Sequence, residues 1–306
     1  MVVNSIDEYI KEICDMNSKL IKNGVGVNQI LLFRGQSNKN YEIIPSIGRE
    51  YGEDNNKSIL HEERNLIEMA KYKLPEIFRE DLQPIELLSL LQHYGIPTRL
   101  LDVTENALVG LYFACSKDSE SDGEVIVFKD NEQDVANFPI INAIAETYKF
   151  CFGIETSLEE FYNKILTQAY FTEQMYYMEK FYPSEKSKVE WIEDECKSIH
   201  FIYAPVHKLR QQMQQGRYIL FSNKISHDED SKTVFFESEI EPIAKDSDVV
   251  EKCITIPADK KKKILDELTL FGVSEEQLFC DNIDIVCKSI FNTFSRNPRG
   301  NIYFVD

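Results

Sequence analysis

The sequence predicts a single α+β domain in which a mixed, twisted sheet of short strands is packed by several helices, with a small helical extension at the C-terminus. Two observations predict this class. Short apolar runs rich in β-branched residues alternate along the chain with longer segments whose apolar residues recur every three or four positions. The 306 residues contain no internal repeat and no low-complexity tract, which excludes a repeat architecture.

The first half of the chain gives the clearer elements. Residues 5–21 have apolar side chains at helical spacing behind polar capping candidates, which predicts a helix. Residues 29–35 (QILLFRG) form a short apolar run that ends at Gly35, so we expect a buried strand with Arg34 near its end. Further helices are predicted over 59–78, 85–94 and 105–115, and further strands over 98–104 and 123–129.

The second half gives weaker patterns. Helices are predicted around 158–166 and 170–181, and a glutamine-rich segment, 209–222, leads through Gly216 into a strand-like run. The chain closes with a predicted strand over 250–256 and predicted helices over 258–270 and 274–288.

These elements divide the chain into three expected parts. They are an N-terminal helix over 1–26, a main domain over 27–290 and a C-terminal tail over 291–306. The polar, charge-rich loop over 223–233 is the best candidate for a break inside the main domain.

Charge and cysteine content limit the class of protein. With 52 acidic and 34 basic residues the formal net charge is -18, which disfavours non-specific binding of nucleic acid but leaves room for a local basic pocket that takes a phosphorylated small molecule. The seven cysteines form no CxxC pair and are expected to be reduced. There is no signal-peptide pattern and no run near the ~18 apolar residues of a membrane span. We therefore expect a cytoplasmic protein without membrane contact, and the oligomeric state stays open.

Arg34 is the first candidate for a site residue. A guanidinium at a strand end beside Gly35 is suited to hold a phosphate or carboxylate through two hydrogen bonds, because glycine lets the backbone approach closely. The alternative, at even odds, is a structural arginine paired with a buried carboxylate such as Asp102.

A second set of polar residues is compressed between positions 93 and 104. His93 is either a proton carrier or ligand contact, or it caps the end of its helix, and the cap is favoured. Asp102 precedes Glu105 by three positions, which is the spacing of a capping box, with Arg99 as its expected ion-pair partner. Thr98 and Thr104 complete the set.

The remaining candidates are amides and acids. Gln214 and Gln215 either lie on a helix surface or bind a ligand at the edge of a site. Glu237 and Glu239 have a spacing that could hold a metal ion in a nuclease-like site, although a solvated strand edge explains them more simply. The chain has no Walker A loop, GxGxxG, GxSxG or HExxH motif, and its five histidines lack metal-ligand spacing, so no metal site is expected.

Several of these strings resemble the FRG domain, a bacterial family with a Phe/Tyr-Arg-Gly signature. The resemblance is carried by FRGQ at 33–36 and HYGIPTRLLDVTENALVGLYFA at 93–114, with QGRY at 215–218 and GVSEEQLFCD at 272–281 in support. It covers roughly residues 27–290. The chain departs from the family pattern at Val103, where tryptophan is common, which removes one stacking surface.

The chain order of Arg34, then Thr98 or Thr104 with Tyr112, then Gln214 or Gln215 is similar to that of the ADP-ribosyltransferase superfamily, and this second resemblance implies its fold and a site for NAD. Its order of residues places Arg34 on the pyrophosphate, a threonine with Tyr112 near the nicotinamide ribose, and a late amide or acid beside the ribose hydroxyl. We therefore expect an NAD-binding, ADP-ribosyltransferase-like or NAD-glycohydrolase-like effector with a nucleotide or a macromolecular acceptor as partner, in phage defence or a toxin system. The catalytic candidates are Arg34, Thr104, Gln215 and Glu237. The ligand-binding candidates are Arg34, Gly35, Gln36, His93, Thr98, Arg99, Asp102, Tyr112 and Gln214.

Two alternatives stay open. A non-catalytic binding module predicts that Arg34, His93, Arg99 and Asp102 satisfy one another in a closed polar network with no pocket beside them. A metal-dependent nuclease ranks third and predicts that any activity depends on a divalent cation.

Overall fold

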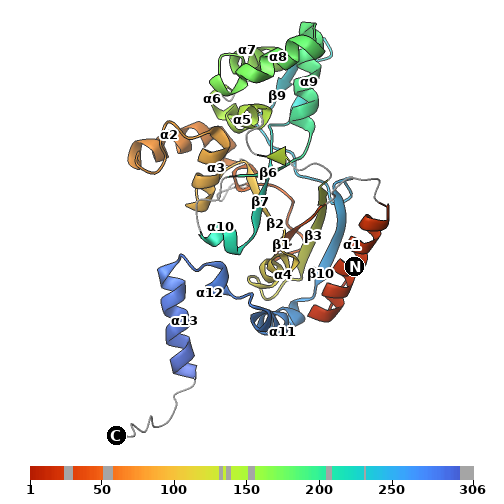
Figure 1. Ribbon diagram of the computed structural model, residues 1–306, viewed down its shortest axis with the longest axis vertical. Helices are drawn as coiled ribbons and strands as arrows, with labels where there is room; N and C mark the ends of the chain where they lie inside the picture. The colour runs from red at the N-terminus through yellow and green to blue at the C-terminus, as the bar shows by residue number, and fades with distance from the viewer. Residues whose placement is uncertain are drawn as a thin grey trace.

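The computed structural model describes residues 1–23, 30–50, 58–130, 134–135, 139–150, 156–204, 209–230 and 232–296. Its centre is a seven-stranded sheet with strand order β10-β3-β1-β2-β7-β6-β4, joined by a small sheet with the order β5-β9-β8 (Figure 1). Neighbouring strands are antiparallel except β4 and β6, which are parallel. The predicted α+β class with a mixed sheet is therefore confirmed.

The strands of the large sheet are β1 (Ile30–Gln36), β2 (Leu100–Thr104), β3 (Gly123–Asp130), β4 (Asp134–Val135), β6 (His200–Tyr203), β7 (Gly216–Leu220) and β10 (Val250–Ile256). Those of the small sheet are β5 (Thr156–Ser157), β8 (Ile225–His227) and β9 (Val234–Phe236). The predicted break at 223–233 contains β8, which pairs with β9.

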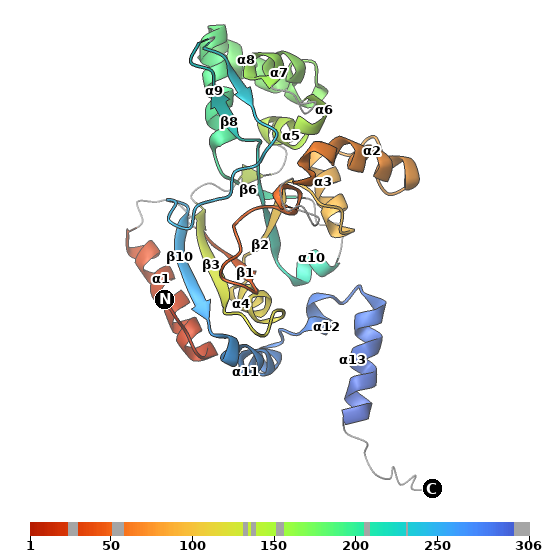
Figure 2. The same cartoon turned by 180° about the vertical axis from the view of Figure 1, so that it is seen from behind.

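Three helices cover one face of the large sheet. They are α1 (Ile6–Asn23), α4 (Ala107–Cys115) and α11 (Ala258–Leu268), and Figure 2 shows them beside β1, β3 and β10. Helix α4 is apolar almost all round because it packs between β1 and α11. On the opposite face, Ile43, Ile44 and Ile47 pack against strand residues such as Leu32 and Phe128. The end of β1 is thus enclosed from both sides.

A helical lobe packs beyond the β7 side of the sheet. It consists of α5 (Pro139–Ala145), α6 (Thr147–Phe150), α7 (Leu158–Ile165), α8 (Thr172–Phe181) and α9 (Glu185–Lys197). Helices α2 (Glu63–Lys73) and α3 (Pro84–His93) share its hydrophobic core. No helix in the described ranges has the length and apolar character needed to cross a lipid bilayer.

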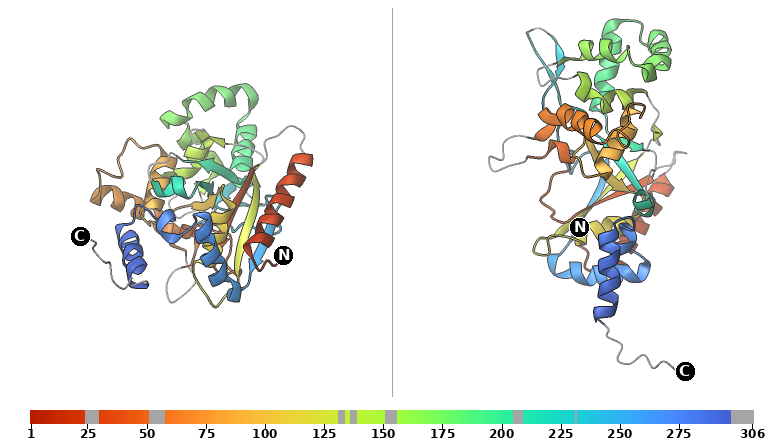
Figure 3. Two further views of the ribbon diagram at one scale, coloured as in Figure 1. Left: turned by 60° about the horizontal axis from the view of Figure 1, so that its bottom comes forward. Right: turned by 90° about the vertical axis from the view of Figure 1, so that its left-hand side faces the viewer.

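The C-terminal helices lie at the other end of the molecule. They are α12 (Glu275–Leu278), which packs near α10 (Leu209–Met213), and α13 (Ile283–Arg296), which extends away from the sheet (Figure 3). The single helix predicted over 274–288 is wrong, because two side chains start separate helices. Ser274 accepts a hydrogen bond from the Gln277 backbone, and Asn282 accepts one from the Asp284 backbone.

The long helix predicted over 59–78 is also shorter in the structure. A 3-10 turn, η2 (Ile59–Glu62), precedes α2, which ends at Lys73, and a turn over 74–78 follows. The apolar spacing continues past the helix end because Phe78, on this turn, is buried in the same core. Periodicity alone therefore predicts a helix that is too long.

The cap of α4 is Asn106 and not Asp102, so the predicted capping role of Asp102 is wrong. Asp102 lies within β2, opposite Tyr218, whereas the Asn106 carboxamide accepts hydrogen bonds from the backbone N–H groups of Leu108 (3.0 Å) and Val109 (3.3 Å). The strand extends two residues beyond Asp102, which moves the helix start to the next side chain able to cap it.

We expect Asn106→Ala to lower the free energy of unfolding by about 1 kcal/mol, because two backbone donors lose their acceptor. Urea unfolding followed by circular dichroism measures the change. Asp102→Asn is the matched control, since it removes the charge and leaves the cap intact. If the control is destabilised as much as Asn106→Ala, the assignment of the cap is incorrect.

Candidate functional site

A pocket of about 370 Å³ opens where strands β1 and β2 diverge. Within the described strands, only Phe33 and Thr104 face each other as a β1–β2 pair, whereas β1 and β3 pair along the whole of β1. We call this cavity the β1–β2 pocket. Its charged walls are formed by Arg34, Arg49, His93, Asp102, Lys117, Arg210 and Arg217, of which Arg217 is paired with Asp130.

The Arg34 side chain connects β1 to β2 at the point where backbone pairing between these strands stops. Its Nη1 donates a 2.6 Å hydrogen bond to the backbone carbonyl of Asp102. Among the described residues its buried Nε has no hydrogen-bond partner. Burial lowers the pKa of the Arg34 guanidinium to about 10; Asp102 opposes this shift and the nearby cation Arg49 adds to it. The guanidinium is therefore held in place by one bond, with a donor left over.

The alternative of a structural arginine paired Arg34 with a carboxylate such as that of Asp102, but the structure gives Arg34 a different acceptor. Arg34 binds the carbonyl of Asp102, while the Asp102 carboxylate accepts a 2.9 Å hydrogen bond from Gln92 Nε2. Within the described ranges the Arg34 charge is therefore not neutralised by a direct ion pair, and the pocket keeps its positive character.

Three further cations complete the pocket. Arg49 makes only long hydrogen bonds of 3.3 and 3.4 Å to the Ile44 carbonyl, and the Arg210 guanidinium lies 4.4 Å from the centre of the Phe279 ring. Across the described part of the chain, neither these residues nor Lys117 and Arg34 take part in an ion pair. A concentration of unpaired positive charge in a protein of net charge -18 favours an anionic ligand.

A buried lysine fixes the position of Lys117. Lys261 of α11 is 2% exposed, and its Nζ donates to the carbonyls of Ser37 (2.6 Å), Lys117 (3.2 Å) and Asp118 (2.6 Å). Burial lowers the pKa of Lys261. This ammonium ties the end of β1 to the loop after α4, so the Lys117 side chain is presented from an anchored backbone.

His93 and Asp281 meet at the rim of the pocket. His93 Nε2 lies 3.8 Å from the Asp281 carboxylate, and both side chains are partly exposed. His93 ends α3, as the sequence predicts, and it lines the same cavity as Arg34. Asp281, which precedes α13, therefore lies next to His93, the first residue of the 93–114 motif.

Thr104 and Gln214 also line the pocket, but their polar groups bind the protein. Thr104 Oγ1 donates to the Gln214 carbonyl at 2.6 Å and accepts from the Asn106 N–H at 3.0 Å. Gln214 Nε2 donates to the Leu278 carbonyl at 3.1 Å. The neighbouring Gln215 is exposed with φ 46°, and its carbonyl accepts from the Glu105 N–H. These residues connect β2, α10 and α12 around the site.

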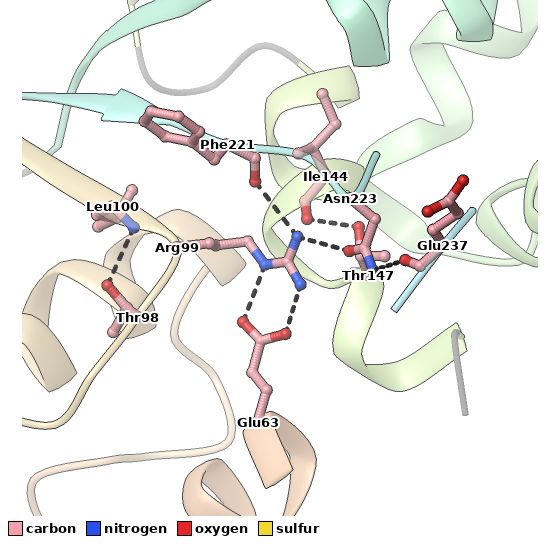
Figure 4. A network of polar contacts seen from close by, with 9 residues as sticks. All are labelled: Glu63, Thr98, Arg99, Leu100, Ile144, Thr147, Phe221, Asn223 and Glu237. Carbon is pink, nitrogen blue, oxygen red and sulfur yellow. Dashed lines mark hydrogen bonds and ion pairs between the residues drawn. The ribbon is translucent and has the colours of Figure 1, made fainter. Parts of the chain in front are cut away.

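Arg99 lies outside the pocket, in a buried network shown in Figure 4. It is 1% exposed and forms a two-pronged ion pair with Glu63 of α2, and its Nη1 donates to the Phe221 carbonyl and to Asn223 Oδ1. The closed network of Arg34, His93, Arg99 and Asp102 that a binding module predicted is therefore not formed.

Four other predicted residues are also placed away from the cavity. Thr98 is buried and its hydroxyl donates to Gln92 Oε1 at 2.9 Å, while Gln36 is buried at the end of β1. Tyr112 packs in the core between α4 and α11. Glu237 binds Lys224 at 3.1 Å next to the small sheet, and its carbonyl accepts from Asn223 (Figure 4).

The pocket therefore unites six of the predicted site residues and separates the rest. Those that line it are Arg34, Gly35, His93, Asp102, Thr104 and Gln214. Glu237 and Arg99 are remote from it, and no group of three or more His, Cys, Asp or Glu side chains in the described ranges is placed to hold a metal ion. Sequence reasoning missed Arg49, Lys117 and Arg210. Lys117 lies just after the 93–114 motif and Arg210 lies in the glutamine-rich segment, but neither residue nor Arg49 has a pattern of its own that marks it as a site residue.

Comparison with protein families gives a match over one part of the chain. Residues 29–123 match the model of the FRG domain family, which confirms the resemblance found in the sequence. The match contains β1, β2, α4 and the pocket residues Arg34, Arg49, His93, Asp102 and Lys117. No curated protein and no solved structure matches the chain.

Proposed function

We propose that this FRG domain binds a phosphate-bearing nucleotide such as NAD in the β1–β2 pocket. The observation that carries the proposal is the buried, unpartnered Nε of Arg34 in a cavity that also holds Arg49, Lys117 and Arg210. A buried donor without an acceptor is costly, and a phosphate oxygen supplies the acceptor and the opposite charge together. Arginine forks match the geometry of phosphate.

The size and charge of the molecule favour a small ligand over a nucleic acid. The volume of about 370 Å³ lies near the lower end of the range of about 300–1,000 Å³ for small-molecule pockets. It suits one phosphate-bearing group, and the net charge of -18 repels a long polyanion from the rest of the surface.

The proposal extends to hydrolysis or transfer of ADP-ribose, with Asp102 in place of the acids considered from the sequence. In this reaction the bond between nicotinamide and C1′ of the ribose breaks, the electron pair leaves with nicotinamide, and water or an acceptor hydroxyl bonds to C1′ and releases a proton. A carboxylate stabilises the positive charge that develops at C1′. Asp102 lines the pocket, whereas Glu237 lies near the small sheet. A role in phage defence or as a toxin would follow from NAD consumption and rests on the resemblance.

A non-catalytic nucleotide-binding module is the second candidate. The Thr104 hydroxyl is hydrogen-bonded to two backbone groups, and the Asp102 carboxylate accepts from Gln92. Because both side chains already bind the protein, this arrangement favours a module without catalysis. Measuring nicotinamide release from NAD separates the two: release that is lost in Asp102→Asn supports the enzyme, and binding without release supports the module.

We expect Arg49→Ala to weaken the binding of NAD by about tenfold or more, because one charge-assisted hydrogen bond contributes about 1.5–3 kcal/mol. Isothermal titration at a fixed, low salt concentration measures the affinity. Arg34→Lys is the second variant, because it keeps the charge and removes the fork. Arg79→Ala is the control, since Arg79 pairs with Asp81 at the surface outside the pocket. Absence of binding of NAD, ADP and pyrophosphate to the wild-type protein would overturn the proposed function.

A further inference from the structure

A second cavity, of about 1060 Å³, lies next to the β1–β2 pocket and shares one residue with it. Its polar walls include Tyr41, Glu42, Arg49, Glu50, His61 and Glu239. We call it the acidic cavity. Arg49 lines both cavities, so its guanidinium is placed to contact a ligand in either one.

The wall between the cavities is a single short element. The 3-10 turn η1 (Ser46–Gly48) has Ser46 facing the β1–β2 pocket and Gly48 facing the acidic cavity, and Arg49 follows directly. Buried Ile47 fixes this turn in the core beneath the sheet. The junction is thus a fixed part of the fold.

The two cavities have opposite charge. The β1–β2 pocket contains Arg34, Lys117 and Arg210 in addition to Arg49, whereas the acidic cavity contains three glutamates. Within the described ranges, Glu42 and Glu50 form no ion pair, while Glu239 binds Lys224. A ligand that fits both must therefore carry its negative charge at one end only.

The acidic cavity offers contacts for the other end of a nucleotide. Carboxylates accept hydrogen bonds from ribose hydroxyls, as acidic residues do in dinucleotide sites. Tyr41 is 52% exposed at the cavity wall and presents an aromatic ring on which a base can stack. A repulsive field from Glu42 and Glu50 would exclude a second phosphate there and would favour an uncharged or positively charged ring.

We propose that one bipartite ligand occupies both cavities: its phosphates lie in the β1–β2 pocket against Arg34 and Arg49, and an uncharged nucleoside lies in the acidic cavity beside Tyr41. NAD has this distribution of charge, since its diphosphate is anionic and its adenosine is uncharged, and the ribose that carries nicotinamide stays in the β1–β2 pocket, which Asp102 lines. The inference rests on the proposed function and adds the orientation of the ligand and the subsite for its second half.

The test compares two probes that differ in the second half of the ligand, NAD and pyrophosphate, by isothermal titration. We expect Tyr41→Ala to weaken NAD binding by about tenfold, as for loss of a stacked base, and to leave pyrophosphate binding within about twofold. Arg49→Ala is expected to weaken both. Tyr72→Ala is the matched control, because Tyr72 is 83% exposed on α2 and lines neither cavity.

The outcomes separate this inference from the proposed function. Equal affinity of the wild-type protein for NAD and pyrophosphate, with no effect of Tyr41→Ala, overturns the second subsite and leaves the phosphate pocket in place. A loss of NAD binding in Tyr41→Ala that is matched by Tyr72→Ala also overturns it. Failure of both probes to bind the wild-type protein removes the proposed function and the inference with it.

Discussion

Replacing Arg99 by methionine is expected to lower the free energy of unfolding by about 3–5 kcal/mol, which is the usual cost of removing one partner from a buried ion pair. Arg99 is 1% exposed and Glu63 is 3% exposed, so the variant leaves a carboxylate without water and without a countercharge. The same substitution removes the donors to the Phe221 carbonyl and to Asn223. The measurement is urea unfolding followed by circular dichroism.

Two controls identify the cause of the loss. Arg79→Met removes an exposed pair with Asp81 and is expected to cost less than about 1 kcal/mol. The double variant Arg99→Met/Glu63→Leu removes both charges and is expected to be more stable than Arg99→Met alone, because no charge is left buried. A double variant that is no more stable than Arg99→Met would show that the isolated Glu63 charge is not the cause.

Arg99 also shows where sequence reasoning fails. Its neighbour in the motif, Asp102, was the expected partner, but Asp102 lies within β2 and accepts from Gln92, whereas Arg99 precedes the strand and binds Glu63. Glu63 begins α2, a helix in which most of the other charged residues are exposed. A charge on an amphipathic helix has the same sequence pattern whether solvent or a buried arginine faces it.

The fold was largely predictable where short apolar runs or apolar residues at helical spacing stand out clearly in the sequence. The predicted strands over 29–35, 123–129 and 250–256 are β1, β3 and β10, which form one end of the large sheet. Strand β6 was not predicted, and the order that places β1 between β2 and β3 has no local signal, because long-range pairing is set by packing and not by neighbouring residues.

The candidate site was predictable where an unusual residue stands next to a special backbone position. Arg34 was identified because it precedes Gly35, and it does line the pocket. Arg49, Lys117 and Arg210 come from separate segments, and each resembles an ordinary surface cation in the sequence. Only the tertiary structure shows that the four charges converge.

Replacing Gly35 by alanine is expected to cost at least about 3 kcal/mol, which is the upper part of the usual range for overpacking in a core. An added Cβ would lie 2.0 Å from the carbonyl oxygen of Gly110, 2.5 Å from the Ala114 nitrogen and 2.8 Å from the Phe113 carbonyl carbon. All three are backbone atoms of α4, so no side chain can rotate away to relieve the contact, and the helix must leave the sheet. Gly35 is thus required for the packing of α4 against β1. The sequence interpretation explained this glycine by the close approach of a ligand instead.

Gly216→Ala is the matched control for Gly35→Ala, because both glycines lie in strands of the same sheet. At Gly216 the added Cβ meets Gln211 at 3.7 Å, an ordinary contact, so we expect a change in melting temperature of a few degrees at most. Thermal unfolding followed by circular dichroism measures both variants. Equal melting temperatures for Gly35→Ala and the wild type would show that α4 adjusts without loss. Because Lys117 lies two residues after the end of α4, a folded Gly35→Ala variant is also expected to bind NAD more weakly, which would link the packing of this helix to the charge of the pocket.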